Sequence, residues 1–264
     1  MTQQGIAQVN GAALHYRLEG PEDGHPVVFA NSLGTDFRTW DKVVAALPEA
    51  RVLRYDKRGH GLSDDPDTGW AMGDLVADAA GLMDQFGLKG ACFVGLSVGG
   101  LIAQGLAAER PDLVRLLVLC DTAARIGNDD MWNARIETVT QGGMAALAHG
   151  VLERWFTPAF FDDPNFPMWR NMLLRTSSQA YARVSAAIRD TDLLESTARL
   201  QLPTMAVVGA NDGATPPDLV RETAGLITGS QFHVIKAAGH LPCVDQPEAL
   251  ITLLRGFLAD HGAL

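Results

Sequence analysis

Six short apolar runs recur along this chain, and segments of helical character separate most of them. The runs lie at residues 27–30, 52–55, 91–94, 114–119, 205–208 and 232–235. Continuous apolar runs of this length are typical of strands buried on both faces, as in parallel sheets that helices cover on each side. The pattern therefore predicts an α/β fold with a mostly parallel central sheet flanked by helices.

Two local patterns add detail to this sheet. The dipeptide Asn10-Gly11 joins two further strand-like stretches, 6–9 and 13–18, and it favours the tight turn of a β-hairpin. We expect this hairpin to supply antiparallel edge strands. Between Met72 and Phe86 the apolar residues follow the period of a helix, and Gly87 can end it. That helix should pack on the sheet.

Strand signals are absent between about residue 124 and residue 192, and four successive helices are predicted there instead. The segment is rich in aromatic and methionine side chains, which suggests a cap that faces a substrate pocket. The same side chains could instead fill the core of the cap itself. We expect a core domain of residues 1–123 and 193–264 and an inserted helical cap of residues 124–192. The predicted helices lie at 132–139, 144–155, 168–174 and 180–188.

Residues 95–99, Gly-Leu-Ser-Val-Gly, fit the G-x-S-x-G pattern of a nucleophile elbow. The motif follows the apolar run at 91–94 and opens a segment rich in Gly and Ala that reads as a helix. A sharp turn from strand to helix strains the serine backbone and requires small neighbours on both sides. Ser97 is therefore the predicted nucleophile.

A serine hydroxyl needs a neighbouring base, and that base needs a carboxylate to orient it. Asp212 follows the run at 205–208 and His240 follows the next one, so they have the order Ser, acid, His that is typical of such elbows. Asp121 is a rival acid, because its loop opens toward the same edge of the sheet. For His60, in the loop Arg-Gly-His-Gly, we favour a structural role.

An oxyanion formed during acyl transfer needs two preorganised donors, usually backbone N–H groups. One should come from the residue after the nucleophile, Val98, and the other from an early loop that follows a strand. The sequence Asn-Ser-Leu-Gly at 31–34 follows the first buried strand, so Leu33 is the expected second donor. A plain glycine turn is the alternative interpretation of this loop.

Composition excludes several classes of function. The net charge of −10, with scattered Lys and Arg, argues against a nucleic-acid partner. No apolar stretch approaches the roughly 20 residues needed to cross a bilayer, and the N-terminus lacks a signal peptide. The three cysteines are an odd number without metal-ligand spacing, so we expect reduced core thiols, no metal and a cytoplasmic location.

These elements together resemble the α/β-hydrolase superfamily, and the finer resemblance is to 3-oxoadipate enol-lactone hydrolases of bacterial aromatic catabolism. The resemblance extends from near Ile6 to Leu258. Core motifs that carry it are Asn-Ser-Leu-Gly-Thr-Asp (31–36), Arg-Tyr-Asp-Lys-Arg-Gly-His-Gly-Leu-Ser (54–63) and Gly-Leu-Ser-Val-Gly-Gly (95–100). More discriminating cap segments are Trp-Asn-Ala-Arg (132–135), Gly-Gly-Met (142–144), Glu-Arg-Trp-Phe (153–156) and Ala-Ala-Ile-Arg-Asp (186–190).

The resemblance implies a triad of Ser97, Asp212 and His240, with the amides of Leu33 and Val98 as oxyanion donors. It also implies the substrate, a five-membered enol-lactone with a carboxymethyl group that is opened to 3-oxoadipate without a cofactor. An anionic substrate would need a cation in the cap. Candidate substrate-binding residues in the family-like segments are Arg135, Arg154, Trp155 and Arg189, although each arginine could instead pair with a cap carboxylate.

Two segments depart from the family pattern. After His240 the chain reads Leu-Pro-Cys-Val-Asp, where Leu-Ser-Asn-Val-Glu is more usual, and residues 183–185 are Arg-Val-Ser, where small residues or Cys are usual. These departures bear on substrate scope rather than on reaction type. A carboxylesterase or lactonase of other scope therefore stays open, as do carbon-carbon bond hydrolysis and perhydrolysis on the same scaffold. A binding module without turnover is disfavoured, because every expected triad member is present.

Overall fold

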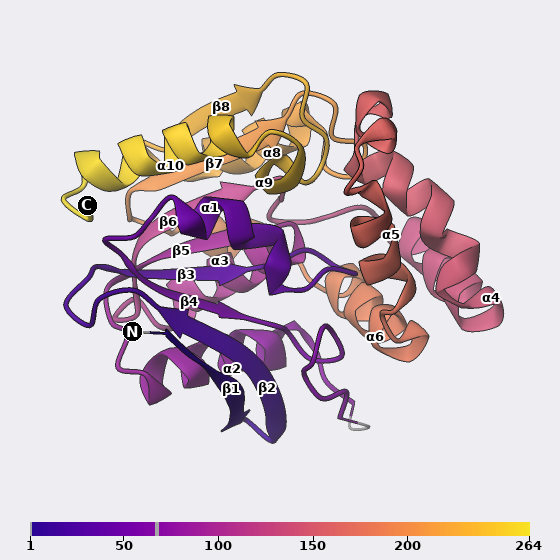
Figure 1. Ribbon diagram of the computed structural model, residues 1–264, viewed down its shortest axis with the longest axis horizontal. Helices are drawn as coiled ribbons and strands as arrows, with labels where there is room; N and C mark the ends of the chain where they lie inside the picture. Colours follow the sequence, from indigo (N-terminus) through magenta and orange to yellow (C-terminus); the bar gives the residue numbers. More distant parts are fainter. Residues whose placement is uncertain (1, 67–68) are drawn as a thin grey trace.

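The computed structural model describes residues 2–66 and 69–264, and within them an eight-stranded sheet forms the centre of the molecule (Figure 1). Strands β3 to β8 run parallel to one another, which confirms the predicted mostly parallel sheet. The order across the sheet is β1-β2-β4-β3-β5-β6-β7-β8. The strands are β1 (Thr2–Val9), β2 (Ala12–Glu19), β3 (Pro26–Ala30), β4 (Arg51–Tyr55), β5 (Ala91–Leu96), β6 (Val114–Cys120), β7 (Thr204–Gly209) and β8 (Gln231–Ile235).

The predicted hairpin forms one edge of this sheet. Strands β1 and β2 pair antiparallel from Thr2 opposite Glu19 to Val9 opposite Ala12, and β2 in turn pairs antiparallel with β4. Asn10 and Gly11 have φ angles of 49° and 74°, the left-handed values that a two-residue hairpin turn requires. The sequence signal at this turn therefore led to the correct local structure.

Helices cover both faces of the sheet, with α1 and α10 in front of it and α3 and α8 behind it in Figure 1. Helix α2 packs beside α3 and buries the apolar stripe predicted for it, including Leu75, Ala79 and Leu82. The helices of the two faces are η1 (Phe37–Trp40), α1 (Asp41–Ala45), α2 (Met72–Gln85), α3 (Val98–Glu109), α7 (Leu194–Ala198), α8 (Pro217–Leu226), α9 (Pro242–Asp245) and α10 (Pro247–Asp260).

The remaining helices, which we call the α4–α6 block, lie together at one end of the sheet (Figure 1). They are α4 (Asp129–Trp155), η2 (Pro158–Asp162), α5 (Phe166–Leu174) and α6 (Ser178–Arg189). Helix α4 combines two of the predicted helices, and Gly143 separates them with φ 69° and ψ −178°, a non-helical conformation. The block falls within residues 124–192, but the division into a core domain and a cap stays a prediction.

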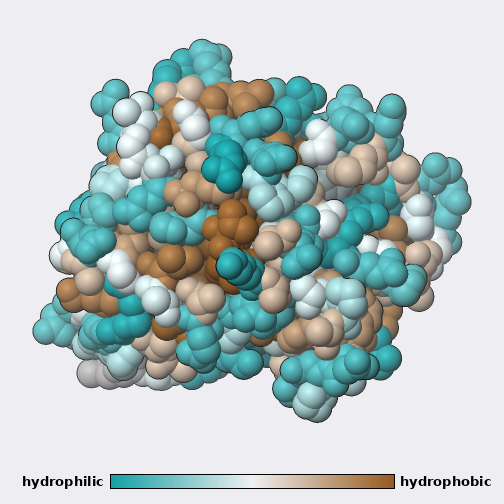
Figure 2. Space-filling model, turned by 90° about the horizontal axis from the view of Figure 1, so that it is seen from above, coloured by the Kyte–Doolittle hydropathy of each residue, from teal (hydrophilic) through white to brown (hydrophobic). Residues whose placement is uncertain are grey.

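Hydrophilic and hydrophobic side chains are unevenly distributed over the surface and the core. Figure 2 shows one face of the molecule, on which hydrophilic side chains predominate and hydrophobic ones gather in a patch near the centre. All three cysteines, Cys92, Cys120 and Cys243, are free thiols in the buried core, as expected. In the part of the chain that the structure describes, no helix is both long enough and apolar enough to span a bilayer.

Candidate active site

Ser97 stands in the turn between β5 and α3. Its backbone has φ 59° and ψ −119°, a strained conformation for a residue with a side chain. Small residues make the turn possible, because a Cβ atom on Gly99 would lie 2.2 Å from the carbonyl oxygen of Ala30. The strand, the turn and the helix follow the order that the motif predicts, and Ser97 itself is 8% exposed.

His240 and Asp212 form a buried pair on the loops that follow β8 and β7. The Nδ1 atom of His240 lies 2.9 Å from Oδ2 of Asp212, and Oδ2 also accepts a hydrogen bond of 2.7 Å from the hydroxyl of Thr215. Because an ionised carboxylate can only accept, the proton of the imidazole belongs on Nδ1, which leaves Nε2 free to act as a base.

The carboxyl of Asp212 is ionised despite its burial. Burial alone would raise its pKa, but the charge of His240 and hydrogen bonds from His240, Thr215 and the amide of Ala214 act the other way. Their net effect lowers the pKa of Asp212 below its usual value. The amides of Ala214 and Thr215 bond Oδ1 at 2.7 and 3.0 Å, so the loop holds this carboxylate in one orientation.

Asp121, the rival acid, is buried close to this pair but has a different environment. One of its oxygens accepts a hydrogen bond of 2.8 Å from the amide of Gly209, while Oδ2 has no partner among the described residues. Burial and the nearby charge of Asp212 raise the pKa of Asp121 well above its ordinary value, which favours the neutral form of this carboxyl. The structure thus brings Asp212, rather than Asp121, into hydrogen bonding with His240.

Asp121, Asp212 and His240 are also the kinds of residue that bind metals. One ligand atom from each lies within 4.8 Å of the others, and no other such group occurs in the ranges 2–66 and 69–264. However, Oδ2 of Asp212 already bonds His240 and Thr215. A cation would have to displace both of these bonds, so the donor set fits a hydrogen-bonded network better than a metal site.

Ser97 and His240 line the same cavity, of about 220 Å³, between the sheet and the α4–α6 block. Nε2 of His240 lies 3.4 Å from the hydroxyl oxygen of Ser32. Among the described residues, His240 makes no hydrogen bond to Ser97. Such bonds are often long before a substrate binds. Ser32, which sequence reasoning did not single out, follows β3 directly and lines the cavity beside Leu33.

The two expected oxyanion donors lie next to this cavity. Val98 is the first residue of α3, where a backbone N–H has no partner within the helix, and Leu33 lines the cavity itself. The structure gives neither N–H an acceptor among the residues it describes. Both residues are buried, so each N–H is a buried donor without a recorded protein acceptor.

Three of the four candidate substrate-binding residues line the cavity, namely Arg135, Arg154 and Trp155. The guanidinium of Arg135 lies 4.9 Å from the ring centre of Trp132, and Arg154 has no ion-pair partner among the described residues. No Asp or Glu lines the cavity. The fourth candidate, Arg189, lies elsewhere, because its side chain bonds Asp190 at 2.7 Å and Asn133 at 2.6 Å and does not line the cavity.

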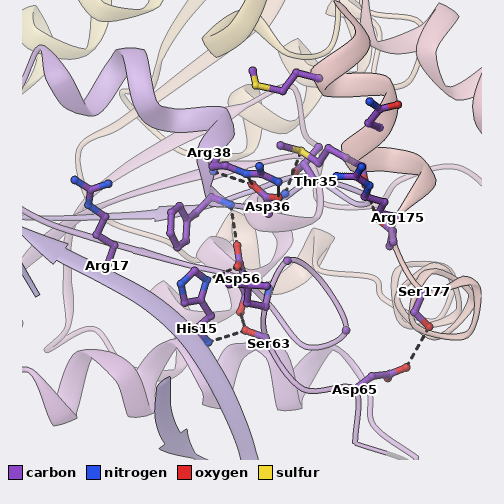
Figure 3. A pocket seen from close by; sticks show the side chains of 18 of the residues that line it. His15, Arg17, Thr35, Asp36, Arg38, Asp56, Ser63, Asp65, Arg175 and Ser177 are labelled. Atoms are coloured by element: carbon purple, nitrogen blue, oxygen red, sulfur yellow. Dashed lines mark hydrogen bonds and ion pairs between the residues drawn. The ribbon is translucent and has the colours of Figure 1, made fainter. Parts of the chain in front are cut away.

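A larger cavity, of about 800 Å³, opens on the far side of the loop that follows β3. Most of its charged groups are paired. Figure 3 shows His15 with Asp56, at 2.8 Å, and Arg38 with Asp36, while Arg17, Asp41 and Asp65 pair with residues outside the lining. Neither Ser97 nor His240 lines it. A paired set of charges holds loops together and leaves few groups for a reaction, so the smaller cavity is the candidate active site.

Comparison with known proteins finds sequences similar to this chain. Residues 27–253 match the alpha/beta hydrolase family. The chain is 34% identical over 256 residues to 3-oxoadipate enol-lactonase 1 of Acinetobacter baylyi, a match that covers 96% of each protein.

Solved structures show the same relationship. An enol-lactonase from Burkholderia xenovorans superposes with a TM-score of 0.93 at 37% identity, covering 97% of this chain and all of that one. A thermophilic esterase from Thermogutta terrifontis superposes with a TM-score of 0.90 at 28% identity and 98% coverage of both. The predicted fold and the resemblance to enol-lactone hydrolases are thereby confirmed, and the chain belongs to the alpha/beta hydrolase family.

Proposed function

We propose that this hydrolase cleaves its substrate with Ser97 as nucleophile, His240 as general base and Asp212 as the carboxylate that orients His240. The observation that carries the proposal is that Ser97, on a strained turn, shares a small cavity with a histidine whose Nδ1 is bonded to a buried carboxylate. A triad is recognised by these geometric roles rather than by its positions in the sequence.

In the first half of the reaction, Ser97 Oγ attacks the carbonyl carbon while its proton passes to Nε2 of His240. The carbonyl oxygen becomes an anion that the N–H groups of Leu33 and Val98 stabilise. When the carbon–oxygen bond of the ester breaks, His240 gives the proton to the leaving oxygen. In a lactone this oxygen belongs to the acyl group, so nothing departs from the site.

In the second half, water attacks the acyl-Ser97 ester while His240 takes one of its protons, and the second tetrahedral anion occupies the same two N–H groups. Its collapse returns the proton to Ser97 and releases a carboxylic acid. The chain's own residues suffice for every step. The α4–α6 block would act as the cap that covers the substrate in the cavity.

The substrate we propose is a small lactone that carries a carboxylate, with 3-oxoadipate enol-lactone as the best candidate. Its opening gives the enol of 3-oxoadipate, which becomes the ketone when the enol proton moves from oxygen to carbon. Enol-lactonase relatives that match nearly the whole chain support this substrate. So does the cavity, which Arg135 and Arg154 line in a protein whose net charge is −10. A cavity of about 220 Å³ also suits a small ring better than a long-chain ester.

The test is kcat/KM for enol-lactones with and without a carboxymethyl group. We expect the carboxylate-bearing lactone to be the better substrate, and Ser97→Ala to lose turnover with both, because the nucleophile is gone. A reagent that acylates or phosphonylates active serines should label wild-type Ser97. Near-normal turnover by pure Ser97→Ala would exclude the mechanism.

A carboxylesterase or lactonase of other scope is the second candidate, supported by the similarity to an esterase over 98% of the chain. The same triad hydrolyses many acyl groups, so the fold does not name the substrate. A preference for neutral esters over the anionic lactone would favour this candidate. Absence of multiple turnover on any activated ester would instead indicate a binding protein.

A further inference from the structure

Lys57 lies in the turn after β4, and its side chain is almost completely buried, with 2% of the residue exposed. Its Nζ donates a hydrogen bond of 2.6 Å to the carbonyl oxygen of Ser32 and a longer one, of 3.4 Å, to that of Thr35. Within the described ranges no ion pair of Lys57 is recorded. Burying an ammonium group without a carboxylate partner costs free energy, so its position calls for an explanation.

The two carboxylates near Lys57 are engaged by other groups. Asp56 accepts hydrogen bonds from the amide of Phe37 at 2.8 Å and from His15, also at 2.8 Å, while Asp36 is bound by Arg38. Burial lowers the pKa of Lys57 to about 7, although the charges of Asp56 and Asp36 act in the opposite direction. What Lys57 contacts directly is therefore the backbone of the loop after β3.

The bonded carbonyl belongs to the peptide group whose other end is the N–H of Leu33. In a planar trans peptide the C=O and the N–H point in opposite directions. Lys57 shares the carbonyl of Ser32 with the hydroxyl of Thr35, which donates to it at 2.9 Å. Donors that fix this carbonyl on one side aim the N–H of Leu33 toward the other side, where Ser32, Leu33 and Ser97 line the cavity. Lys57 itself does not line the cavity, so it cannot touch the substrate.

Lys57 also changes the strength of this N–H as a donor. A charge-assisted hydrogen bond polarises the peptide that accepts it, and hydrogen bonds in a chain strengthen one another in a low-dielectric interior. A second contact steadies the same loop, because the amide of Gly34 donates to Nε2 of His60 at 2.9 Å. His60 touches a different peptide, so it braces the loop without polarising the N–H of Leu33.

We propose that Lys57 is a positioning residue that orients and polarises the Ser32–Leu33 peptide, so that the N–H of Leu33 binds the oxyanion of the transition state. This inference rests on the proposed function. The bond it invokes is already present, at 2.6 Å. The buried ammonium is a cost to stability that transition-state binding explains.

The experiment replaces Lys57 by Met, which keeps the length of the side chain and removes the donor. Losing one complete oxyanion donor typically costs about 100- to 1000-fold in kcat, so weakening one should lower kcat by about 10- to 100-fold with KM nearly unchanged. A trifluoromethyl ketone that forms an anionic adduct on Ser97 should lose affinity by the same factor. Affinity for the carboxylate product should not change.

Matched variants separate this role from a structural one. Lys57→Gln keeps a neutral donor and should retain part of the lost kcat, while the exposed Lys89→Met should leave the affinity ratio of the two ligands unchanged. The thermal midpoint of Lys57→Met should equal or exceed that of wild type, because a buried cation is removed. In its NMR spectrum the amide proton of Leu33 should move upfield, a change visible without substrate.

The outcomes are distinct from those that test the proposed function. Wild-type kcat in Lys57→Met or Lys57→Gln, beside an inactive Ser97→Ala, would overturn the role of Lys57 and leave the nucleophile in place. Equal losses of affinity for the ketone and for the product would also overturn it, since they indicate a damaged cavity. Turnover retained in Ser97→Ala would refute the proposed function itself.

Discussion

Two buried carboxyl groups near His240 differ in their protonation because they differ in their donors. Asp212 receives four hydrogen bonds, from His240, from the side chain and amide of Thr215 and from the amide of Ala214. Asp121 receives one, from Gly209, and its second oxygen is unpartnered among the described residues. A neutral Asp121 beside an ionised Asp212 avoids placing two negative charges in one buried site.

This contrast predicts unequal effects of two isosteric changes. Asp212→Asn should lower kcat by about 10⁴, because an amide at this position favours the wrong tautomer of His240. Asp121→Asn should cost far less, since an amide oxygen still accepts from Gly209 and its NH₂ can donate to Asp212. Steady-state kinetics of both variants decides the assignment. A reversed ranking would transfer the acid role to Asp121.

The buried carboxyl of Asp245 should make the free energy of unfolding depend on pH. Burial raises its pKa to about 6, although the amides of Gly239 and Gln246 act against this shift. Between about pH 4 and pH 6 the unfolded chain releases this proton and the folded protein retains it, so stability falls as pH rises through that window. Asp245→Asn should therefore be about 2–3 kcal/mol more stable than wild type above pH 6, a gain that vanishes below pH 4.

Urea unfolding at several pH values measures this difference directly. The comparison of variant and wild type removes the contributions of the other carboxyl groups, including Asp121, because they titrate in both proteins. The same gain at pH 3.5 and at pH 7 would show that Asp245 does not titrate between them in the way described.

At the scale of elements, the central sheet could be predicted and the packing of its loops could not. Each of the six apolar runs became a strand with ends within two residues of the predicted ones, because burial on both faces demands continuous apolar sequence. Ser97, Asp212 and His240 could be proposed because each follows such a strand. The contacts of Ser32 and Lys57 depend on how two loops pack together, and no periodic signal encodes that.

Arg189 illustrates a second limit. It lies in a segment that resembles enol-lactone hydrolases, yet its guanidinium bonds Asp190 and Asn133 instead of entering the cavity. Which face of α6 a residue occupies follows from the packing of the α4–α6 block, and a one-residue rotation moves a side chain by about 100°. The sequence could therefore identify the arginines as candidates, but it could not predict which of them line the cavity.

Two glycines of helix α4 should respond oppositely to alanine. Gly143→Ala should destabilise the protein by about 1–3 kcal/mol, because φ 69° with ψ −178° is accessible essentially only to glycine. Gly150→Ala should stabilise it by about 0.5–1 kcal/mol, since a Cβ there meets nothing nearer than Arg154 at 3.9 Å. Free energies of unfolding in urea test both. Equal responses would show that Gly143 is not required for the kink.

At the scale of the whole molecule, the net charge of the protein opposes the approach of an anion, whereas the residues that line the cavity favour its binding. The net charge of −10 repels an anionic substrate at long range, and salt screens that repulsion beyond about 10 Å. Arg135 and Arg154 line the cavity, and no acidic residue does. The electrostatic potential of the arginines that line the cavity is therefore opposite in sign to that of the protein's net charge.

This reversal predicts how three arginines should differ when each is replaced by Met. Arg135→Met or Arg154→Met should lower kcat/KM for a carboxylate-bearing lactone by about 10- to 100-fold, the cost of one charge-assisted contact, and should spare a neutral ester of similar size. Arg189→Met is the matched control from the same block, and it should affect neither substrate, because Arg189 does not line the cavity.

Equal losses on both substrates would indicate a collapsed cavity instead of a missing contact. No loss in either cavity variant would place the anion site elsewhere, and a selective loss in Arg189→Met would mean that the block moves when substrate binds.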